Sequence, residues 1–170
     1  MSVIRSFPPL ENRDARILIL GSMPGIASLR AGQYYAHPQN AFWPIMGELV
    51  GADPTLPYDA RAAKLKIAGI ALWDVLASCA RPGSLDADID KTTIVANDFG
   101  SFFGKHPHIR AVFFNGGMAE QSFRHHVAPL LKNLPQSFHR LPSTSPAHAS
   151  LSRRQKALAW AMALREHGIR

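Results

Sequence analysis

Three short, uninterrupted apolar runs constrain the fold of this chain more than any other feature. They are RILIL at residues 16–20, GIALWDV at 69–75 and IRAVFFN at 109–115. Apolar residues that are continuous rather than alternating are typical of strands buried on both faces of a parallel sheet. A fourth and more polar run, QSFHRL at 136–141, predicts an edge strand.

Segments with helical spacing separate these runs, at residues 40–50, 58–68, 116–131 and 150–167. The alternation of strand and helix predicts an α/β domain with a parallel sheet and right-handed crossovers. The expected apolar positions are Ala62, Leu65 and either Ile67 or Ala68 in one helix, and Leu158 and Met162, with Arg165 at the same spacing, in the last. Either Ser150 or Ser152 could cap that last helix.

Composition fits one soluble domain over residues 1–170, with 46% hydrophobic and 18% charged residues. The single cysteine, Cys79, excludes an intramolecular disulfide and any cysteine-based metal cluster. The scattered histidines have no zinc-site spacing, so we expect neither metal nor cofactor. No apolar run reaches the roughly 20 residues of a membrane span, and the first 16 residues lack a signal peptide's apolar core. We therefore expect a cytoplasmic protein.

The chain is strongly basic, with a formal net charge of +7 and a sequence pI near 10.1. A surplus of this size suits a polyanionic partner, because neutralising phosphates releases counterions and dominates affinity for nucleic acid. The alternative is that the charge serves solubility alone. Charge thus favours nucleic acid as a partner without deciding the function.

Glycine, proline and small polar residues follow every predicted strand. The segments are GSMPG at 21–25, Asp74 with LASCARPGSLD, Asn115 with NGGMA, and PSTSPAHAS at 142–150. In open α/β sheets the ligand crevice lies beyond the carboxyl ends of the strands. We therefore expect these segments to converge on one site, together with QYYAHPQNAFW at residues 33–43.

Each of these residues also has a purely structural interpretation. GSMPG matches neither the phosphate-binding glycine patterns nor a nucleophile elbow, and a plain turn accounts for its glycines. Asn40 could cap a helix, and His37 could be a structural hydrogen-bonding residue. Tyr34 and Tyr35 could be core aromatics or a stacking surface. Asp74 could cap its loop or contact a ligand.

Taken in order, the motifs resemble the uracil-DNA glycosylase superfamily, and within it the hypoxanthine-DNA glycosylase branch. They are LILGSMPGIASL, QYYAHPQNAFW, GIALWDV, CARPGSLDADI, NDF, FFNG and LPSTSPA, and the most specific part runs from Leu18 to Trp43. The resemblance implies a three-layer α/β/α fold around a short, mostly parallel four-stranded sheet. It also implies a monomer that binds DNA containing deaminated bases.

Enzymes of this kind flip a nucleotide out of the duplex and hydrolyse its N-glycosidic bond, since the bond cannot be reached inside the stack. The resemblance makes Asn40 the water-positioning catalytic residue, because Ser22 and Met23 stand where several branches carry a carboxylate or amide. An amide cannot deprotonate water strongly, so we expect a slow enzyme. Lyase activity needs an amine nucleophile, and the pocket motifs contain no lysine.

The same resemblance assigns the remaining site residues. Tyr35 would stack on the flipped base, Asp74 would contact its polar edge, and four further residues would line the base pocket: Gly21, Ser22, Met23 and His37. Phosphates would be held by Ser143, Thr144 and Ser145, with Arg153 and Arg154 nearby. Leu141 replaces a histidine that stabilises a uracil anion in many relatives, which favours a purine leaving group.

Three alternatives stay open from sequence alone. The scaffold could release uracil or a mixture of deaminated or mismatched bases. It could recognise damaged DNA without cleaving it, or it could hydrolyse a small nucleotide such as free inosine. The residue that would fill the vacated base stack is also unassigned, with the loop at 143–150 as its expected location.

Overall fold

A four-stranded parallel sheet forms the centre of the computed structural model, which describes residues 2–135 and 137–170. Its strand order is β3-β2-β6-β7, with bounds Ile70–Asp74, Ile17–Gly21, Ala111–Asn115 and Ser137–Leu141. All three pairings are parallel, so the predicted sheet is confirmed, with β7 at the edge. The predicted first residue of that edge strand, Gln136, lies outside the described residues.

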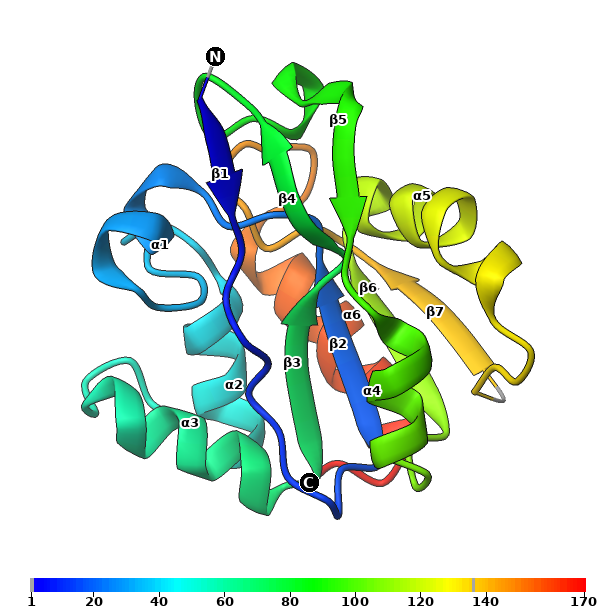
Figure 1. Cartoon of the computed structure of the whole chain (residues 1–170). Helices are drawn as coiled ribbons and strands as arrows, with labels where there is room; N and C mark the ends of the chain where they lie inside the picture. The colour runs from blue at the N-terminus through cyan, green and yellow to red at the C-terminus, as the bar shows by residue number, and fades with distance from the viewer. Residues whose placement is uncertain (1, 136) are drawn as a thin grey trace.

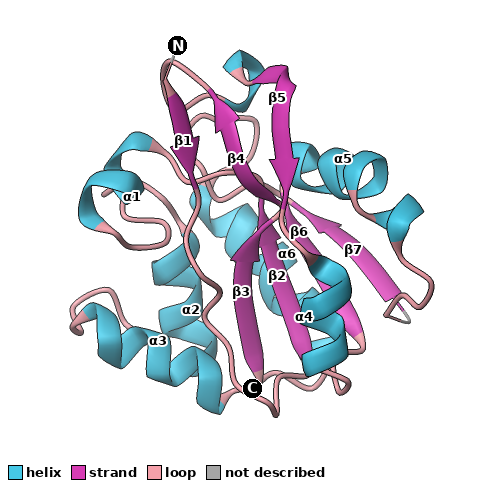
Figure 2. Cartoon of the chain, viewed as in Figure 1, coloured by secondary structure: helices cyan, strands magenta, loops and turns pink. Residues whose placement is uncertain are grey.

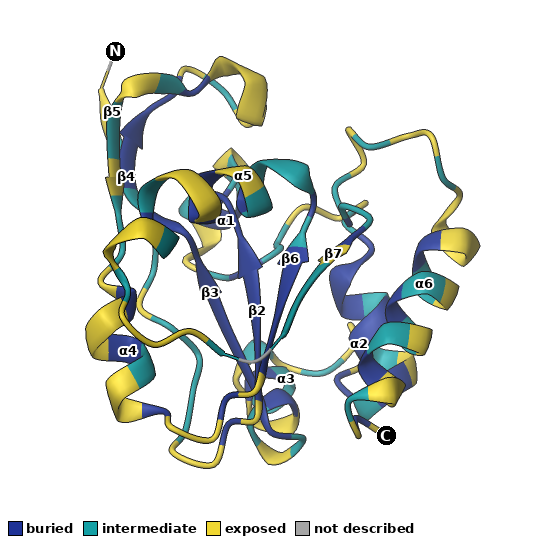
Figure 3. Cartoon of the chain, turned by 90° about the vertical axis from the view of Figure 1, so that its right-hand side faces the viewer, coloured by how far each residue is buried: buried dark blue, intermediate teal, exposed yellow. Residues whose placement is uncertain are grey.

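Helices cover both faces of this sheet, which confirms the predicted three layers (Figure 2). On one face lie α2 (Phe42–Val50), α3 (Tyr58–Ile67) and α6 (Arg153–Glu166). On the other lie α4 (Phe99–Lys105) and α5 (Gly117–His126). Alternate residues of β2 enter the two cores, with Ile17 and Ile19 in the first and Leu18 and Leu20 in the second. Figure 3 shows the buried strands between α4 and the pair α2 and α6.

A second, antiparallel sheet was not predicted. It has the order β1-β4-β5, with bounds Val3–Arg5, Leu76–Ala80 and Asp90–Ala96. The segment after Asp74, expected to be a loop, therefore contains a strand. Because β1 pairs with residues more than 70 positions away, no local pattern announces this sheet. The remaining elements are short: α1 (Ile26–Ala31), η1 (Asp86–Asp88) and η2 (Ala128–Leu130).

The predicted last helix is confirmed, but the residues whose spacing indicated it are not its buried face. Leu158 and Met162 are 57% and 66% exposed, and α6 instead buries Lys156, Trp160 and Leu164. Lys156 and Trp160 donate hydrogen bonds to carbonyls of the loop that follows β7, so tertiary contacts rather than hydropathy select the buried face. Of the two capping serines it is Ser152 that begins the helix, accepting a hydrogen bond from the backbone N–H of Gln155.

The helix faces elsewhere agree better with the sequence. In α3 the buried residues are Ala62 and Leu65, while Ile67 is exposed. No helix within the described part of the chain is long and apolar enough to cross a membrane. All four parallel strands end toward the top of Figure 1, where the loops after β2, β4 and β7 also lie. This end of the sheet is where the site was expected.

Candidate active site

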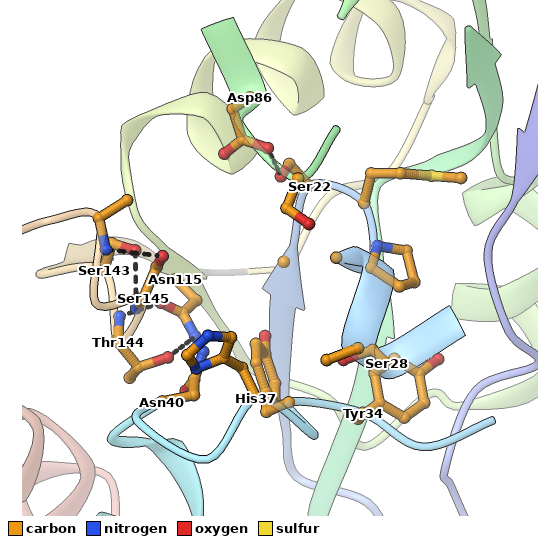
Figure 4. Close-up of a pocket in the computed structure, with 18 of the residues that line it drawn as sticks. Ser22, Ser28, Tyr34, His37, Asn40, Asp86, Asn115, Ser143, Thr144 and Ser145 are labelled. Carbon is orange, nitrogen blue, oxygen red and sulfur yellow. Dashed lines mark hydrogen bonds between the residues drawn. The ribbon is translucent and has the colours of Figure 1, made fainter. Parts of the chain in front are cut away.

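A pocket of about 300 Å³ lies at the carboxyl ends of the parallel strands. Six parts of the chain line it: residues 21–28, four residues of the segment 34–40 (Tyr34, Tyr35, His37 and Asn40), Asp74, residues 84–86, Asn115, and residues 143–147. Figure 4 shows Asn40, His37 and the 143–145 loop on one side and Ser22 with Asp86 on the other. The predicted convergence of the strand-end segments is therefore confirmed.

Gly21 allows the two key side chains of the pocket to approach the backbone. It ends β2, and its carbonyl accepts a hydrogen bond from the backbone N–H of Val75 at 2.8 Å. A Cβ at this position would lie 2.5 Å from Oδ1 of Asp74 and 2.9 Å from the hydroxyl oxygen of Tyr35. No such contact is tolerated in a packed protein, so the glycine is required by space.

Asp74 is a buried carboxyl group at the end of β3. The residue is 3% exposed, and its Oδ2 has no hydrogen-bond partner in the described part of the chain. Burial raises the pKa of Asp74 to about 7; the charge of Asp86 acts in the same direction and the Arg81 guanidinium opposes both. Much of this carboxyl is therefore protonated at neutral pH, and in that form it can act as a hydrogen-bond donor.

The two tyrosines have different roles. The hydroxyl of Tyr34 donates to the carbonyl of Pro8 at 2.9 Å, so this buried ring is a structural anchor. Tyr35 lines the pocket, and its ring lies 4.3 Å, centroid to centroid, from that of Phe42. Its φ of 53° is in the left-handed region that non-glycine residues rarely adopt. Strain held in this way is common where a side chain must be presented to a ligand.

Burial raises the pKa of Tyr35 well above its usual range, with the nearby Asp74 contributing, so this phenol stays protonated. Its buried hydroxyl oxygen has no hydrogen-bond partner among the described residues. The pocket therefore contains two buried oxygen atoms, on Tyr35 and Asp74, whose hydrogen-bonding capacity is unused. Such groups carry an energetic cost unless a ligand satisfies them.

Asn40 lies just before α2, whose N-cap is Ala41, so the predicted capping role of Asn40 was wrong. Its Oδ1 accepts a hydrogen bond from the backbone N–H of Phe42 at 3.0 Å, which fixes the amide at the first turn of α2. The same side chain lines the pocket (Figure 4). A carbonyl oxygen has a second lone pair, so the bond from Phe42 leaves Oδ1 able to accept from a water. His37 is exposed, and its Nδ1 accepts from the backbone N–H of Gln39.

The loop at 143–147 is held in place from beneath. Asn115 and Thr144 exchange two hydrogen bonds of 2.9 Å, in which the amide donates to Oγ1 and accepts from the backbone N–H. Lys156 donates to the carbonyl of Ser145 at 3.0 Å, and Trp160 donates to that of Pro142 at 2.8 Å. Thr144 is 1% exposed, so its hydroxyl serves the loop itself.

Most of the predicted site residues meet at this pocket, whose lining includes Gly21, Ser22, Met23, Tyr35, His37, Asn40, Asp74 and Ser143 to Ser145. Arg153 and Arg154 do not line it; they are exposed at the start of α6. Within the described residues, no group of three His, Cys, Asp or Glu side chains is placed to hold a metal ion.

Sequence reasoning missed the wall built by residues 84–86. The hydroxyl of Ser22 donates to Oδ1 of Asp86 at 2.7 Å, and that of Ser84 accepts from the backbone N–H of Ile26 at 2.8 Å. The buried Arg81 donates to the carbonyls of Gly83 and Pro24. The motif CARPGSLDADI contained this wall, but its residue types gave no sign that it reaches the turn after β2.

Comparison with known proteins places this geometry in a family. The family model described as the uracil DNA glycosylase superfamily matches residues 8–165. Two proteins named hypoxanthine DNA glycosylase are each 34% identical: that of Methanosarcina acetivorans, matching 90% of this chain and 93% of its own, and that of Methanosarcina barkeri, matching 95% and 98%.

A solution NMR structure of a candidate uracil DNA glycosylase from Methanosarcina acetivorans is 33% identical to this chain. The match covers 97% of this chain and 98% of that one, with a TM-score of 0.79. Sequence motifs, fold and pocket position thus agree along nearly the whole length. The chain belongs to the uracil DNA glycosylase superfamily.

Proposed function

We propose that this protein is a monofunctional DNA glycosylase that releases hypoxanthine from deoxyinosine in DNA. The observation that carries the proposal is a protonatable carboxyl, Asp74, buried with a free Oδ2 in the pocket that Asn40 also lines. One group can hold a water and the other can donate to a departing base. The names of the two Methanosarcina relatives support the choice of hypoxanthine.

In the proposed reaction a flipped nucleotide enters the pocket and its base stacks on the ring of Tyr35. Oδ1 of Asn40 accepts a hydrogen bond from a water, which attacks C1′ of the sugar. The N-glycosidic bond breaks, its electron pair goes to the base nitrogen, and a proton of the water is released. Asp74 donates a hydrogen bond to a ring nitrogen or carbonyl of the purine, which stabilises the charge that develops there.

The outer contacts are proposed on the same basis. Ser143 and Ser145 lie on the pocket loop and would hold the flanking phosphates, with Thr144 keeping the loop in shape. The exposed cations Arg153 and Arg154 would meet phosphates farther along the strand. In line with the family resemblance, we propose that the protein acts as a monomer on DNA containing deaminated bases.

A panel of duplexes that carry hypoxanthine, xanthine, uracil or a plain mismatch tests the proposal under single-turnover conditions. We expect hypoxanthine to be released fastest, and Asn40→Ala to abolish its release. Asn133→Ala, at an exposed loop position, is the matched control and should behave as the wild type. Dominant release of uracil, or full activity of Asn40→Ala, would contradict the assignment. Salt-sensitive binding without any base release would favour a damage-binding module.

A further inference from the structure

Leu85 is a large apolar side chain left exposed at the rim of the pocket. It is 53% exposed, and it lines the pocket from the loop between β4 and β5. Among the large hydrophobic residues that are exposed in the described part of the chain, only Ile26 shares this position at the pocket. An exposed apolar residue beside a binding site indicates a contact with the ligand.

The chain holds both neighbours of Leu85 in fixed positions. Ser84 accepts a hydrogen bond from the backbone N–H of Ile26, and Asp86 accepts one from the hydroxyl of Ser22. The buried guanidinium of Arg81 ties the same loop to the turn after β2. The leucine therefore stands on an ordered loop, and little entropy is lost when it enters a partner.

On the opposite rim, the residues that line the pocket include no large apolar side chain. The loop at 143–147 contributes serines, a threonine, Pro146 and Ala147 to the pocket, and its hydroxyl and amide groups suit phosphates. Ala147 carries only a methyl group, too short to reach between base pairs. The expectation that the filling residue comes from this loop therefore has weak support in the structure.

We propose that Leu85 enters the base stack of duplex DNA and fills the space that the flipped nucleotide leaves. This inference rests on the proposed function, because the space exists only once a nucleotide has moved into the pocket. Apolar side chains are used in this way because unstacked base faces are poorly hydrated and gain contact with a hydrocarbon. The placement at the rim allows one leucine to hold the duplex open while the pocket holds the base.

The test compares Leu85→Ala with the wild type on two DNAs that carry the same deoxyinosine, one duplex and one single-stranded. Only the duplex has a stack to fill. We expect single-turnover release from the duplex to fall roughly tenfold or more, and release from the single strand to change less than about twofold. Leu85→Met, which keeps an apolar side chain of similar length, should restore most of the duplex rate.

Leu130→Ala is the control, since Leu130 is 81% exposed but does not line the pocket. Equal losses on both DNAs would show that Leu85 shapes the pocket instead, and no loss on either would also overturn the proposal. A duplex-selective loss in His148→Ala but not in Leu85→Ala would assign the role to the 143–150 loop.

A second measurement separates this inference from the proposed function. Binding is followed on a duplex with 2-aminopurine beside an abasic analogue, where no chemistry is needed. At saturating concentrations of protein, binding of the wild type should change the fluorescence of the 2-aminopurine. Binding of Leu85→Ala should leave that fluorescence unchanged. If the wild type releases no hypoxanthine, the proposed function fails while this signal still reports on Leu85. Equal changes in fluorescence with both proteins would refute the insertion of Leu85 into the base stack.

Discussion

Replacing Asp74 by asparagine tests the electrostatics of the pocket, because the change removes one titration and keeps the size of the side chain. Burial raises the pKa of this carboxyl from 3.8 to about 7 in the folded chain, and the charge of Asp86 adds to the effect. The fold therefore favours the neutral acid over the carboxylate. Ionisation at neutral pH must then be reflected in the stability of the protein.

The sign and size of the effect follow from the two pKa values. Below pH 3.8 the group is protonated whether the chain is folded or unfolded, and it has no effect on stability. As the pH rises the unfolded chain ionises first, so stability falls until the folded-state value of about 7 is passed. At about 1.4 kcal/mol per pKa unit the complete loss is about 4 kcal/mol, and about 2.5 kcal/mol of it falls between pH 5 and pH 8.

Urea unfolding of the wild type and of Asp74→Asn across this pH interval measures the loss, because other titrations cancel in the difference. We expect the wild type to lose about 2.5 kcal/mol more than the variant as the pH rises from 5 to 8. Asp14→Asn, at an exposed position, should follow the wild type. Parallel curves for the wild type and Asp74→Asn would refute the argument that this carboxyl is held neutral by burial.

The Asp74→Asn substitution should also change how the rate of base release depends on pH. If protonated Asp74 donates to the leaving base, single-turnover release by the wild type falls as the pH rises through about 7. The amide of Asp74→Asn donates at every pH, so its slower rate should be flat over the same interval. A wild-type rate that rises through pH 7 would instead assign the ionised carboxylate to the reaction.

Three further predictions concern the frame of the site. Gly21→Ala overpacks the contact with the buried carboxyl of Asp74, and it should cost about 1–3 kcal/mol of stability and abolish base release. Gly83→Ala places its methyl group in open space, so its stability in urea unfolding should equal that of the wild type. Trp160→Phe removes the hydrogen bond to the loop carbonyl and should cost about 1–3 kcal/mol, seen in the same assay. Arg153→Ala and Arg154→Ala should each lower the slope of log affinity against log salt by about one, measured by titration of duplex DNA.

The parallel sheet was predictable because its information is local. Each buried strand is a continuous apolar run, so residues 16–20, 69–75 and 109–115 identify themselves without reference to the rest of the chain. The antiparallel sheet carries no such signal, since Val3–Arg5 is short and its partner strand lies more than 70 residues away. For α6 the spacing of the apolar residues predicted the helix but not its buried face, because the anchoring role of Trp160 depends on a loop that the helical pattern does not contain.

The candidate site, like the fold, was predictable only where the information is local in the sequence. The identities of Asn40, Tyr35 and Asp74 came from motifs, and the structure places all three at one pocket. The backbone conformation and hydrogen bonding of these residues could not be predicted from motifs, because they depend on what surrounds each residue in three dimensions. The left-handed backbone of Tyr35, the free Oδ2 of Asp74 and the close approach of both side chains to Gly21 are properties of the folded chain that no motif contains.

The position of the carboxyl groups explains why a slow enzyme is expected. The turn after β2 supplies Ser22 and Met23 and no acid, so nothing there can take a proton from the attacking water. Among the residues described, the acids that line the pocket are Asp74 at the end of β3 and Asp86, which already accepts a hydrogen bond from Ser22. Burial raises the pKa of Asp74 to about 7, so a large share of this carboxyl is protonated at neutral pH and able to donate. In the proposed mechanism the catalytic assistance therefore falls on the departing base, and a purine, with several ring nitrogens that accept hydrogen bonds, would gain most from it.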